Sequence, residues 1–191
     1  MADSNITKQA LAASLKNLME EVPFDKINVA RICEGCGMSR KSFYYHFKDK
    51  YDLVNWIFDT EFLEVVTDYL NLDNYTDRWK LIETSCTYFY ENRSFYRKAL
   101  QIKGQNSFPD HLREIIQPIL KARLGELDKE QGQEMEEFAL DFFVDAIVDA
   151  IVRWLTDKDC IPAEEFVEKV RHLVESTATA IYREADENDS L

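Results

Sequence analysis

Residues 28–47, NVARICEGCGMSRKSFYYHF, decide the fold. Asn28 and Ser39 are residue types that cap helix N-termini, and each precedes a short segment with apolar residues at helical spacing. Gly35-Cys36-Gly37 ends the first of these segments, because glycine accepts the left-handed backbone of a helix C-terminus. The stretch therefore predicts a helix-turn-helix whose second helix runs from Arg40 to about His46.

The outward positions of this second helix carry hydrogen-bond donors suited to DNA base edges and phosphates. Phe43 and Phe47 are expected to point inward and fix the angle of the helix. A hairpin that only packs is the alternative, and the Tyr44–Phe47 aromatic run and the two caps argue against it. The predicted DNA-binding residues are Asn28, Ser39, Arg40, Lys41, Ser42, Tyr44, Tyr45, His46, Lys48 and Lys50.

The charge of the chain is divided between its two ends. The whole chain carries a formal charge of −13, which by itself argues against nucleic acid. Residues 1–50, however, hold eight lysines and arginines against six acidic residues, so the acidic excess lies entirely in residues 51–191. A weakly cationic head on an acidic body is consistent with DNA binding by the head alone.

The rest of the chain predicts helices only. Five glycines and four prolines in 191 residues, with 46% hydrophobic residues, favour helices over short strands. We expect an all-α fold of about nine helices, with a helix-turn-helix domain at 1–47 and a second domain at 48–191 that begins with a connecting helix at 49–71. Beside the two short helices, apolar periodicity predicts helices at 6–22, 49–71, 76–91, 94–102, 108–124, 131–156 and 162–183.

Residues 6–60 resemble the TetR family of bacterial transcriptional regulators. The resemblance rests on Phe24-Asp25-Lys26-Ile27, Ile32-Cys33, Gly37-Met38-Ser39, Phe43-Tyr44-Tyr45-His46-Phe47, Lys50 and Leu53. Asn28 stands where threonine is usual, and Cys33 and Cys36 where alanine is usual. The resemblance implies a cytoplasmic homodimer that binds a pseudo-palindromic operator in double-stranded DNA, usually as a repressor released by a small-molecule effector.

Two later segments, Phe95–Leu100 and Gly104–Phe108, resemble the TetR subgroup associated with dihydroxyacetone kinase operons. This resemblance implies the alternative of an activator gated by a kinase-like partner protein. A DNA-bound structural adaptor without an effector is a third interpretation.

The family also implies an effector pocket and a dimer interface in the second domain. Aromatic residues and one histidine are the pocket candidates, although most aromatics at helical spacing belong to a core. These candidates are Phe62, Trp79, Tyr88, Phe89, Phe108, His111, Phe138, Phe142 and Trp154. The expected dimer interface consists of the last two helices, through Ile147, Ile151, Leu155, Phe166, Val170, Leu173, Val174, Thr177 and Ile181.

No metal, cofactor or catalytic site is predicted. Cys33-x-x-Cys36 lacks the further ligands that a structural zinc needs, so packing is favoured, with a thiol switch left open. Asp141, Asp145 and Asp149 share a helix face that would suit a hard cation or, as we favour, a solvated stripe partly offset by Arg153. No nucleophile has a base beside it. No apolar run is long enough for a membrane span, and we expect no signal peptide and reduced thiols.

Overall fold

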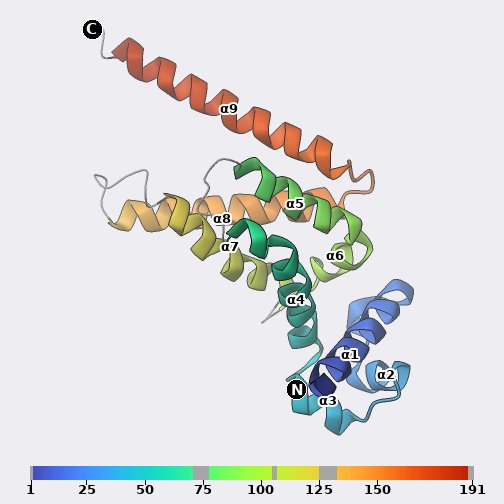
Figure 1. Cartoon of the computed structure of the whole chain (residues 1–191). Helices are drawn as coiled ribbons and strands as arrows, with labels where there is room; N and C mark the ends of the chain where they lie inside the picture. Colours follow the sequence, from blue (N-terminus) through green and yellow to red (C-terminus); the bar gives the residue numbers. More distant parts are fainter. Residues whose placement is uncertain (1, 71–77, 105–106, 125–132, 189–191) are drawn as a thin grey trace.

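The computed structural model describes residues 2–70, 78–104, 107–124 and 133–188, and all regular structure within them is helical (Figure 1). This confirms the all-α prediction. Side chains are described for residues 4–66, 79–104, 107–121 and 137–176. The helices are α1 (Ala2–Glu21), the 3₁₀ turn η1 (Phe24–Lys26), α2 (Val29–Gly35), α3 (Arg40–His46), α4 (Lys50–Leu70), α5 (Arg78–Glu91), α6 (Arg93–Ala99), α7 (Phe108–Leu124), α8 (Gln133–Thr156) and α9 (Ala163–Asn188).

The main differences from the predicted bounds lie at helix ends. The first helix begins at Ala2 rather than at residue 6, and the last continues to Asn188 rather than 183. The helix predicted at 94–102 ends at Ala99. Beyond it, the Gln101 and Ile102 amides donate to carbonyls three residues back, so the chain tightens into a 3₁₀-like turn.

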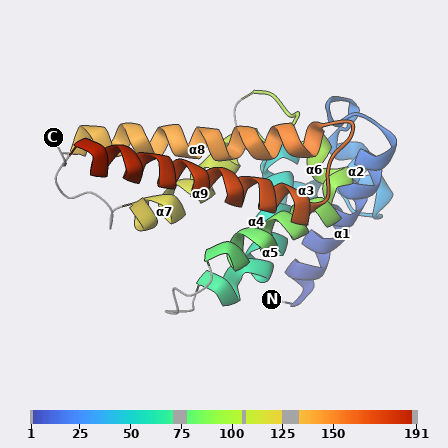
Figure 2. The same cartoon turned by 90° about the horizontal axis from the view of Figure 1, so that it is seen from above.

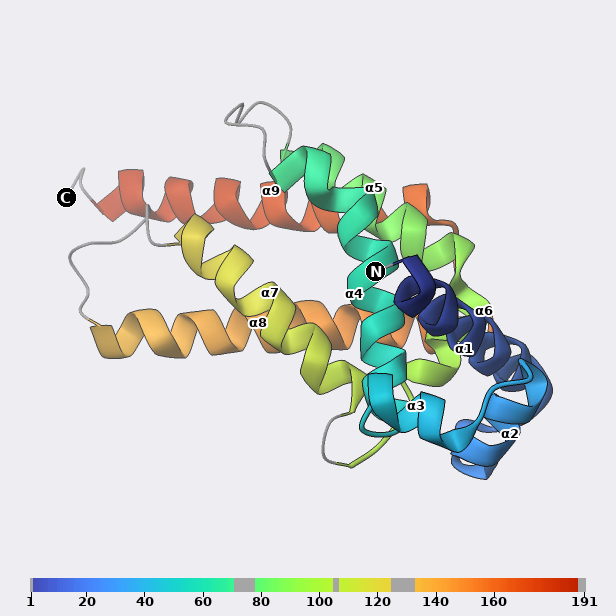
Figure 3. The same ribbon diagram turned by 60° about the horizontal axis from the view of Figure 1, so that its bottom comes forward.

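Helix α4 lies at the centre of the molecule. It packs on α1 of the N-terminal region and on α5 and α7 of the C-terminal region (Figure 3). Leu53, Ile57 and Phe58 on this helix are fully buried. A single cluster of buried side chains therefore runs from α1–α3, which we call the head, through α4 into α5–α9, which we call the body.

The last two long helices are held by different neighbours. Helix α8 packs on α7 and on α6, whereas α9 packs on α5. Figure 2 shows both helices extending away from the head. None of the described helices combines the length and apolarity that crossing a lipid bilayer requires.

Candidate nucleic-acid interface

Side-chain caps and a glycine turn set the geometry of the helix-turn-helix. Asn28 Oδ1 accepts a hydrogen bond from the Arg31 amide, and Ser39 Oγ accepts one from the Ser42 amide, both at 3.0 Å. Gly37 adopts the left-handed backbone (φ 69°), and the next amide, of Met38, donates to the Cys33 carbonyl at 2.9 Å. Both predicted caps and the predicted turn are confirmed.

Helix α3 has one buried face and one exposed face. Phe43 and Phe47 are buried, as predicted, with ring centroids 5.7 Å apart. On the opposite face, Tyr45 is 83% exposed and Tyr44 is 59% exposed. Exposed side chains bury little surface and so contribute little to folding. Two large exposed aromatic side chains side by side are typical of a surface that binds a partner.

Most of the predicted DNA-binding residues lie together on this exposed surface. Ser39, Lys41, Ser42, Tyr44 and Tyr45 line one shallow hollow. Arg40, Lys48 and Asn28 are exposed, and His46 is partly exposed, beside Tyr45. The surface offers cationic, hydroxyl and phenol donors to one ligand, which suits the edge of a duplex.

Lys50 does not lie as predicted. Its Nζ donates to the carbonyls of Phe24 and Ile27, each at 2.7 Å, and lies 4.3 Å from the centre of the Phe24 ring. Burial lowers the pKa of Lys50, and the neighbouring Asp25 and Asp49 carboxylates oppose this effect. The ammonium therefore fastens η1 to α4, and the expectation that it meets phosphate is corrected.

Ser14 is a residue of the head that the sequence pattern did not single out. Its buried Oγ donates to the Ile32 carbonyl at 2.7 Å and so ties α1 to α2. A Cβ atom at Gly35 would lie 2.4 Å from this oxygen. Gly35 is therefore required for close packing of α1 on α2, in addition to its place near the helix end.

The head cysteines are free thiols. Cys36 Sγ lies 3.4 Å from the Ile32 carbonyl, to which it donates. Burial raises the pKa of Cys33, the nearby Cys36 adds to this, and Arg40 opposes it. Among the described residues, no group of three or more histidine, cysteine or acidic side chains is arranged to hold a metal ion.

Polar contacts connect the head to the body. Lys16 of α1 pairs with Glu61 of α4 at 2.5 Å, and Glu61 accepts from the Tyr88 hydroxyl at 3.2 Å. The Tyr88 and Tyr96 hydroxyls lie 2.6 Å apart, and burial raises the pKa of both phenols. These contacts join α1, α4, α5 and α6 in one network.

Helix α6 makes a second connection. Lys98 Nζ donates to the carbonyls of Met19 and Glu20, at the C-terminal end of α1. The preceding Arg97 donates to the Thr156 carbonyl, at the end of α8, at 3.2 Å. Two adjacent residues therefore join the ends of two helices that are remote in the sequence.

The structure divides the predicted effector-pocket residues into separate groups. Phe62, Tyr88, Phe89 and Phe108 are buried and pack, with Phe58 and Tyr96, into one cluster of rings. His111 lies at the edge of this cluster, with its ring 6.2 Å from Phe58.

The other pocket candidates lie elsewhere. Trp79 contacts Arg171, and Trp154 stacks between Tyr90 and Phe166. Phe138 and Phe142 are 68% and 60% exposed, so their assignment to an interior pocket is wrong. Their spacing along α8 does not distinguish them from core residues, because an apolar helix face has the same periodicity whether it is buried or exposed.

The predicted dimer residues also divide. Ile147, Leu173 and Val174 are exposed, and Phe166 and Val170 are partly exposed. Ile151 and Leu155 are buried within the protomer, because the end of α8 packs on α6, so their assignment to an interface is wrong. Thr177 and Ile181 belong to α9, but their side chains lie outside the described residues.

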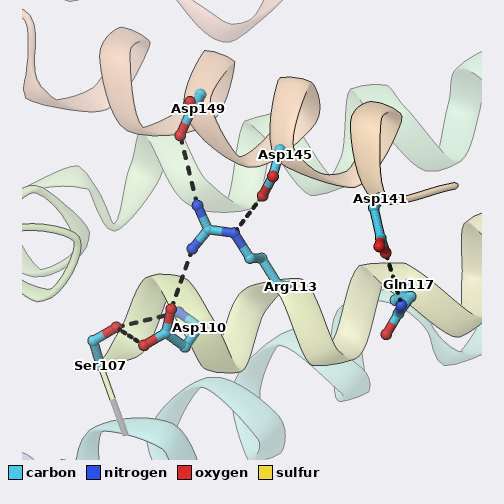
Figure 4. Close-up of polar contacts among 7 residues, drawn as sticks. All are labelled: Ser107, Asp110, Arg113, Gln117, Asp141, Asp145 and Asp149. Atoms are coloured by element: carbon cyan, nitrogen blue, oxygen red, sulfur yellow. Dashed lines mark hydrogen bonds and ion pairs between the residues drawn. The ribbon is translucent and has the colours of Figure 1, made fainter. Parts of the chain in front are cut away.

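The three aspartates of α8 contact polar side chains of α7. Figure 4 shows Arg113 between the two helices, with Nε 2.7 Å from Asp145 Oδ1 and Nη2 3.7 Å from Asp149 Oδ1. Asp141 accepts from Gln117 at 3.3 Å. The partner that offsets Asp145 and Asp149 is therefore Arg113, not the predicted Arg153. Spacing within one helix does not reveal charges on a neighbouring helix.

His111 introduces a pH dependence. Its Nε2 lies 2.6 Å from Asp59 Oδ1, and this hydrogen bond raises the pKa of His111 although burial opposes it. A raised folded-state pKa contributes stability that is present in full below the ordinary value of 6.5 and is lost as the pH rises through the folded value. His111→Gln should therefore lower the free energy of unfolding by about 1–2 kcal/mol at pH 5.5 and by less at pH 8.5.

Urea unfolding of both proteins at the two pH values measures this difference. His172→Gln on the exposed face of α9 is the matched control and should change stability little at either pH. An equal loss for His111→Gln at pH 5.5 and pH 8.5 would contradict the role assigned to the ion pair.

Family models match most of the chain. The model described as "Bacterial regulatory proteins, tetR family" matches residues 11–57, and the one described as "Transcriptional regulator C-terminal region" matches residues 77–176. A curated relative, the HTH-type dhaKLM operon transcriptional activator DhaS of Lactococcus lactis subsp. lactis, is 32% identical over 102 residues. The alignment covers 53% of each protein, so it spans about half the length of that relative.

Solved structures share the fold. A TetR transcriptional regulator from Streptococcus agalactiae is 18% identical and superposes with a TM-score of 0.68, covering 91% of this chain and 96% of the other. A putative TetR-family regulator from Syntrophomonas wolfei is 15% identical, with a TM-score of 0.69 and coverage of 92% and 96%. A dihydroxyacetone kinase operon activator, DhaS, is 20% identical, with a TM-score of 0.60 and coverage of 90% and 96%.

Proposed function

The chain belongs to the TetR family of bacterial transcriptional regulators, and from this premise we propose that it binds a pseudo-palindromic operator as a homodimer, with one α3 in the major groove of each half-site. Proteins of this family are DNA-binding regulators rather than enzymes, and this one acts in the cytoplasm, where bacterial DNA lies. The observation that carries the proposal is the exposed face of α3, where Tyr44, Tyr45 and Lys41 project from a helix fixed by buried Phe43 and Phe47. Two such helices related by a two-fold axis require a two-fold operator.

Fluorescence anisotropy tests this proposal directly. Labelled duplexes from upstream of the gene and its neighbours are titrated with the purified protein at several salt concentrations, and the bound duplex is footprinted. We expect saturable, salt-sensitive binding with a two-fold footprint. Binding no tighter than to a scrambled duplex, for every promoter tried, would refute operator recognition at these genes.

Lys41 and Lys50 provide a sharp internal comparison. Lys41→Ala should weaken operator binding. The salt slope, which is the slope of log affinity against log salt concentration, should fall in magnitude by about one per protomer. The free energy of unfolding should change by less than about 0.5 kcal/mol. Lys50→Met should lower the free energy of unfolding by about 1–3 kcal/mol, because the Phe24 and Ile27 carbonyls lose a charged donor. Its salt slope should stay unchanged at temperatures where the variant is folded.

Anisotropy and urea unfolding on both variants separate the two roles. A reduced salt slope for Lys50→Met with normal stability would show that the ammonium contacts phosphate after all.

The dimer is proposed to form through the exposed apolar faces of α8 and α9. Phe138, Phe142, Phe143, Leu173 and Val174 are each at least 45% exposed. Large apolar side chains gathered on two helices are unusual on the free surface of a protein and typical of an interface. Pairing these faces across a two-fold axis would bury them in a four-helix arrangement.

Regulation by an effector is the second part of the proposal. Four of the pocket candidates pack with Phe58 and Tyr96 in one cluster of buried rings, which supports an effector that binds at the surface of the body. A surface site suits either a small molecule or a protein partner. Repression remains the family's usual mode, whereas the relative from Lactococcus lactis is named an activator. Expression of a reporter gene behind the bound promoter, compared in strains with and without the regulator, distinguishes repression from activation.

A further inference from the structure

A groove of about 570 Å³ lies between the α5–α6 junction and the loop that joins α8 to α9. Three cations line it: Arg93 and Arg97 from α6, and Lys158 from the loop. Tyr90 and Leu155 supply apolar surface to the same groove. Its volume lies in the range of small-molecule sites, and it combines apolar walls with converging polar groups, as such sites do.

The two arginines are held in place before any ligand arrives. They are four residues apart on α6, so they project from the same face of the helix. Arg93 stacks on the Tyr90 ring at 4.6 Å and donates to the Tyr90 carbonyl at 3.1 Å. Arg97 donates to the Thr156 carbonyl at 3.2 Å. A guanidinium has five N–H donors, so each arginine keeps donors for an anion while its side chain is already ordered.

The electrostatic balance of the groove favours an anion. Glu91 and Asp159 also line it, so the three cations outnumber the carboxylates in a chain whose net charge is −13. Burial raises the pKa of the Cys160 thiol; Arg93 and Arg97 oppose this increase, and the more weakly acting Asp157 adds to it. Cys160 of the loop lines the same groove, and both guanidiniums act on it.

We propose that this groove binds a small phosphate-bearing ligand, whose phosphate is held by Arg93, Arg97 and Lys158. Phosphate oxygens match the forked donors of arginine, and the remainder of the ligand would lie against Tyr90 and Leu155. The binding step itself is independent of operator binding; only its regulatory consequence rests on the proposed function.

That consequence follows from the position of Arg97. A phosphate bound to the free donors of Arg97 shares this guanidinium with the Thr156 carbonyl at the end of α8. The next residue, Lys98, holds the end of α1 through the Met19 and Glu20 carbonyls. A ligand in the groove therefore acts on α6, the helix that joins α8 to the head. If its affinity differs between two arrangements of α6 and the head, its binding shifts the balance between them.

The test is calorimetric titration of the full chain with two probes, inorganic phosphate and glycerol 1-phosphate, at an ionic strength held constant with sodium chloride. We expect saturable binding of at least one probe and a higher melting temperature in its presence. Tighter binding of glycerol 1-phosphate identifies a phosphate monoester as the ligand, and equal or tighter binding of inorganic phosphate identifies the free ion. Heat no greater than for sodium chloride with both probes would overturn the proposal.

Variants localise the site. Arg93→Gln and Arg97→Gln should each weaken probe binding at least tenfold, and Lys158→Gln, in the loop, should weaken it several-fold without touching helix packing. Arg153→Gln removes an equal charge from an exposed position on α8 outside the groove and should bind the probe normally. Probe binding within twofold of the parent in Arg93→Gln, Arg97→Gln and Lys158→Gln would overturn the assignment.

Operator binding is measured on the same preparations, with and without the probe. Probe binding without operator binding would refute the proposed function and leave the groove standing. Operator binding without probe binding would refute the groove alone.

Discussion

Phe58→Ala is expected to lower the free energy of unfolding by about 3–5 kcal/mol, the largest loss of stability among our predictions. Phe58 is fully buried on α4. Its ring contacts Phe62 of the same helix at 4.6 Å and Phe108 of α7 at 5.2 Å, with Tyr96 of α6 and Phe89 of α5 close behind. Removing it opens a cavity among four helices that the neighbouring rings are too rigid to fill.

Urea unfolding followed by circular dichroism measures this loss at a fixed protein concentration, because the proposed dimerisation would make stability depend on concentration. Phe58→Leu is the matched control and should cost much less, since it keeps most of the buried volume. The result also bears on effector binding. A loss below about 1 kcal/mol for Phe58→Ala would mean that the ring cluster is loosely packed and that an interior pocket is open.

Phe142→Asp is expected to separate the dimer. Phe142 is 60% exposed in the protomer and contacts the neighbouring Phe143 of α8, with ring centroids 5.5 Å apart. A two-fold interface contains this residue twice, so the variant removes two phenyl groups and introduces two carboxylates. Loss of their burial alone is about 3–6 kcal/mol, which raises the dimer dissociation constant roughly a hundred- to ten-thousandfold.

Sedimentation velocity over a range of concentrations measures the dissociation constant, and anisotropy measures the accompanying loss of operator affinity. Ile6→Asp is the control for oligomeric state, because Ile6 is 64% exposed on α1 rather than on α8 or α9. A Phe142→Asp protein that remains a dimer at the concentrations where the parent does would place the interface on another surface.

The head could be predicted closely because local interactions specify it. Asn28 and Ser39 cap helices through bonds to amides three residues away, and Gly37 supplies a backbone conformation that other residues rarely adopt. Phe43 and Phe47 lie four positions apart along α3 and its C-cap, so both rings point to the same side, which is the buried one. All the residues that make these local interactions lie within about twenty positions of one another, so the sequence alone reveals them.

The errors share one physical origin, which is that they depend on contacts distant in sequence. Lys50 follows α3 closely, but its ammonium lies against carbonyls 23 and 26 residues earlier. Phe142 and Leu155 lie in the same apolar pattern of α8, yet one is exposed and the other is buried under α6. Amphipathic periodicity tells which side of a helix is apolar, but it does not tell whether the same chain or a second copy covers that side.

The continuous buried cluster has a consequence for how such regulators diverge. Tyr44, Tyr45 and Lys41 lie outside that cluster, so their replacement leaves most of the folding free energy intact. Given the proposed contact of these positions with the operator, a duplicated gene can change its target promoter through them with little risk of producing an unfolded protein. Because head and body share the cluster, a destabilising change of specificity can also be compensated by a substitution far away, in the body. The fold thus separates the evolution of target choice from the maintenance of the folded state.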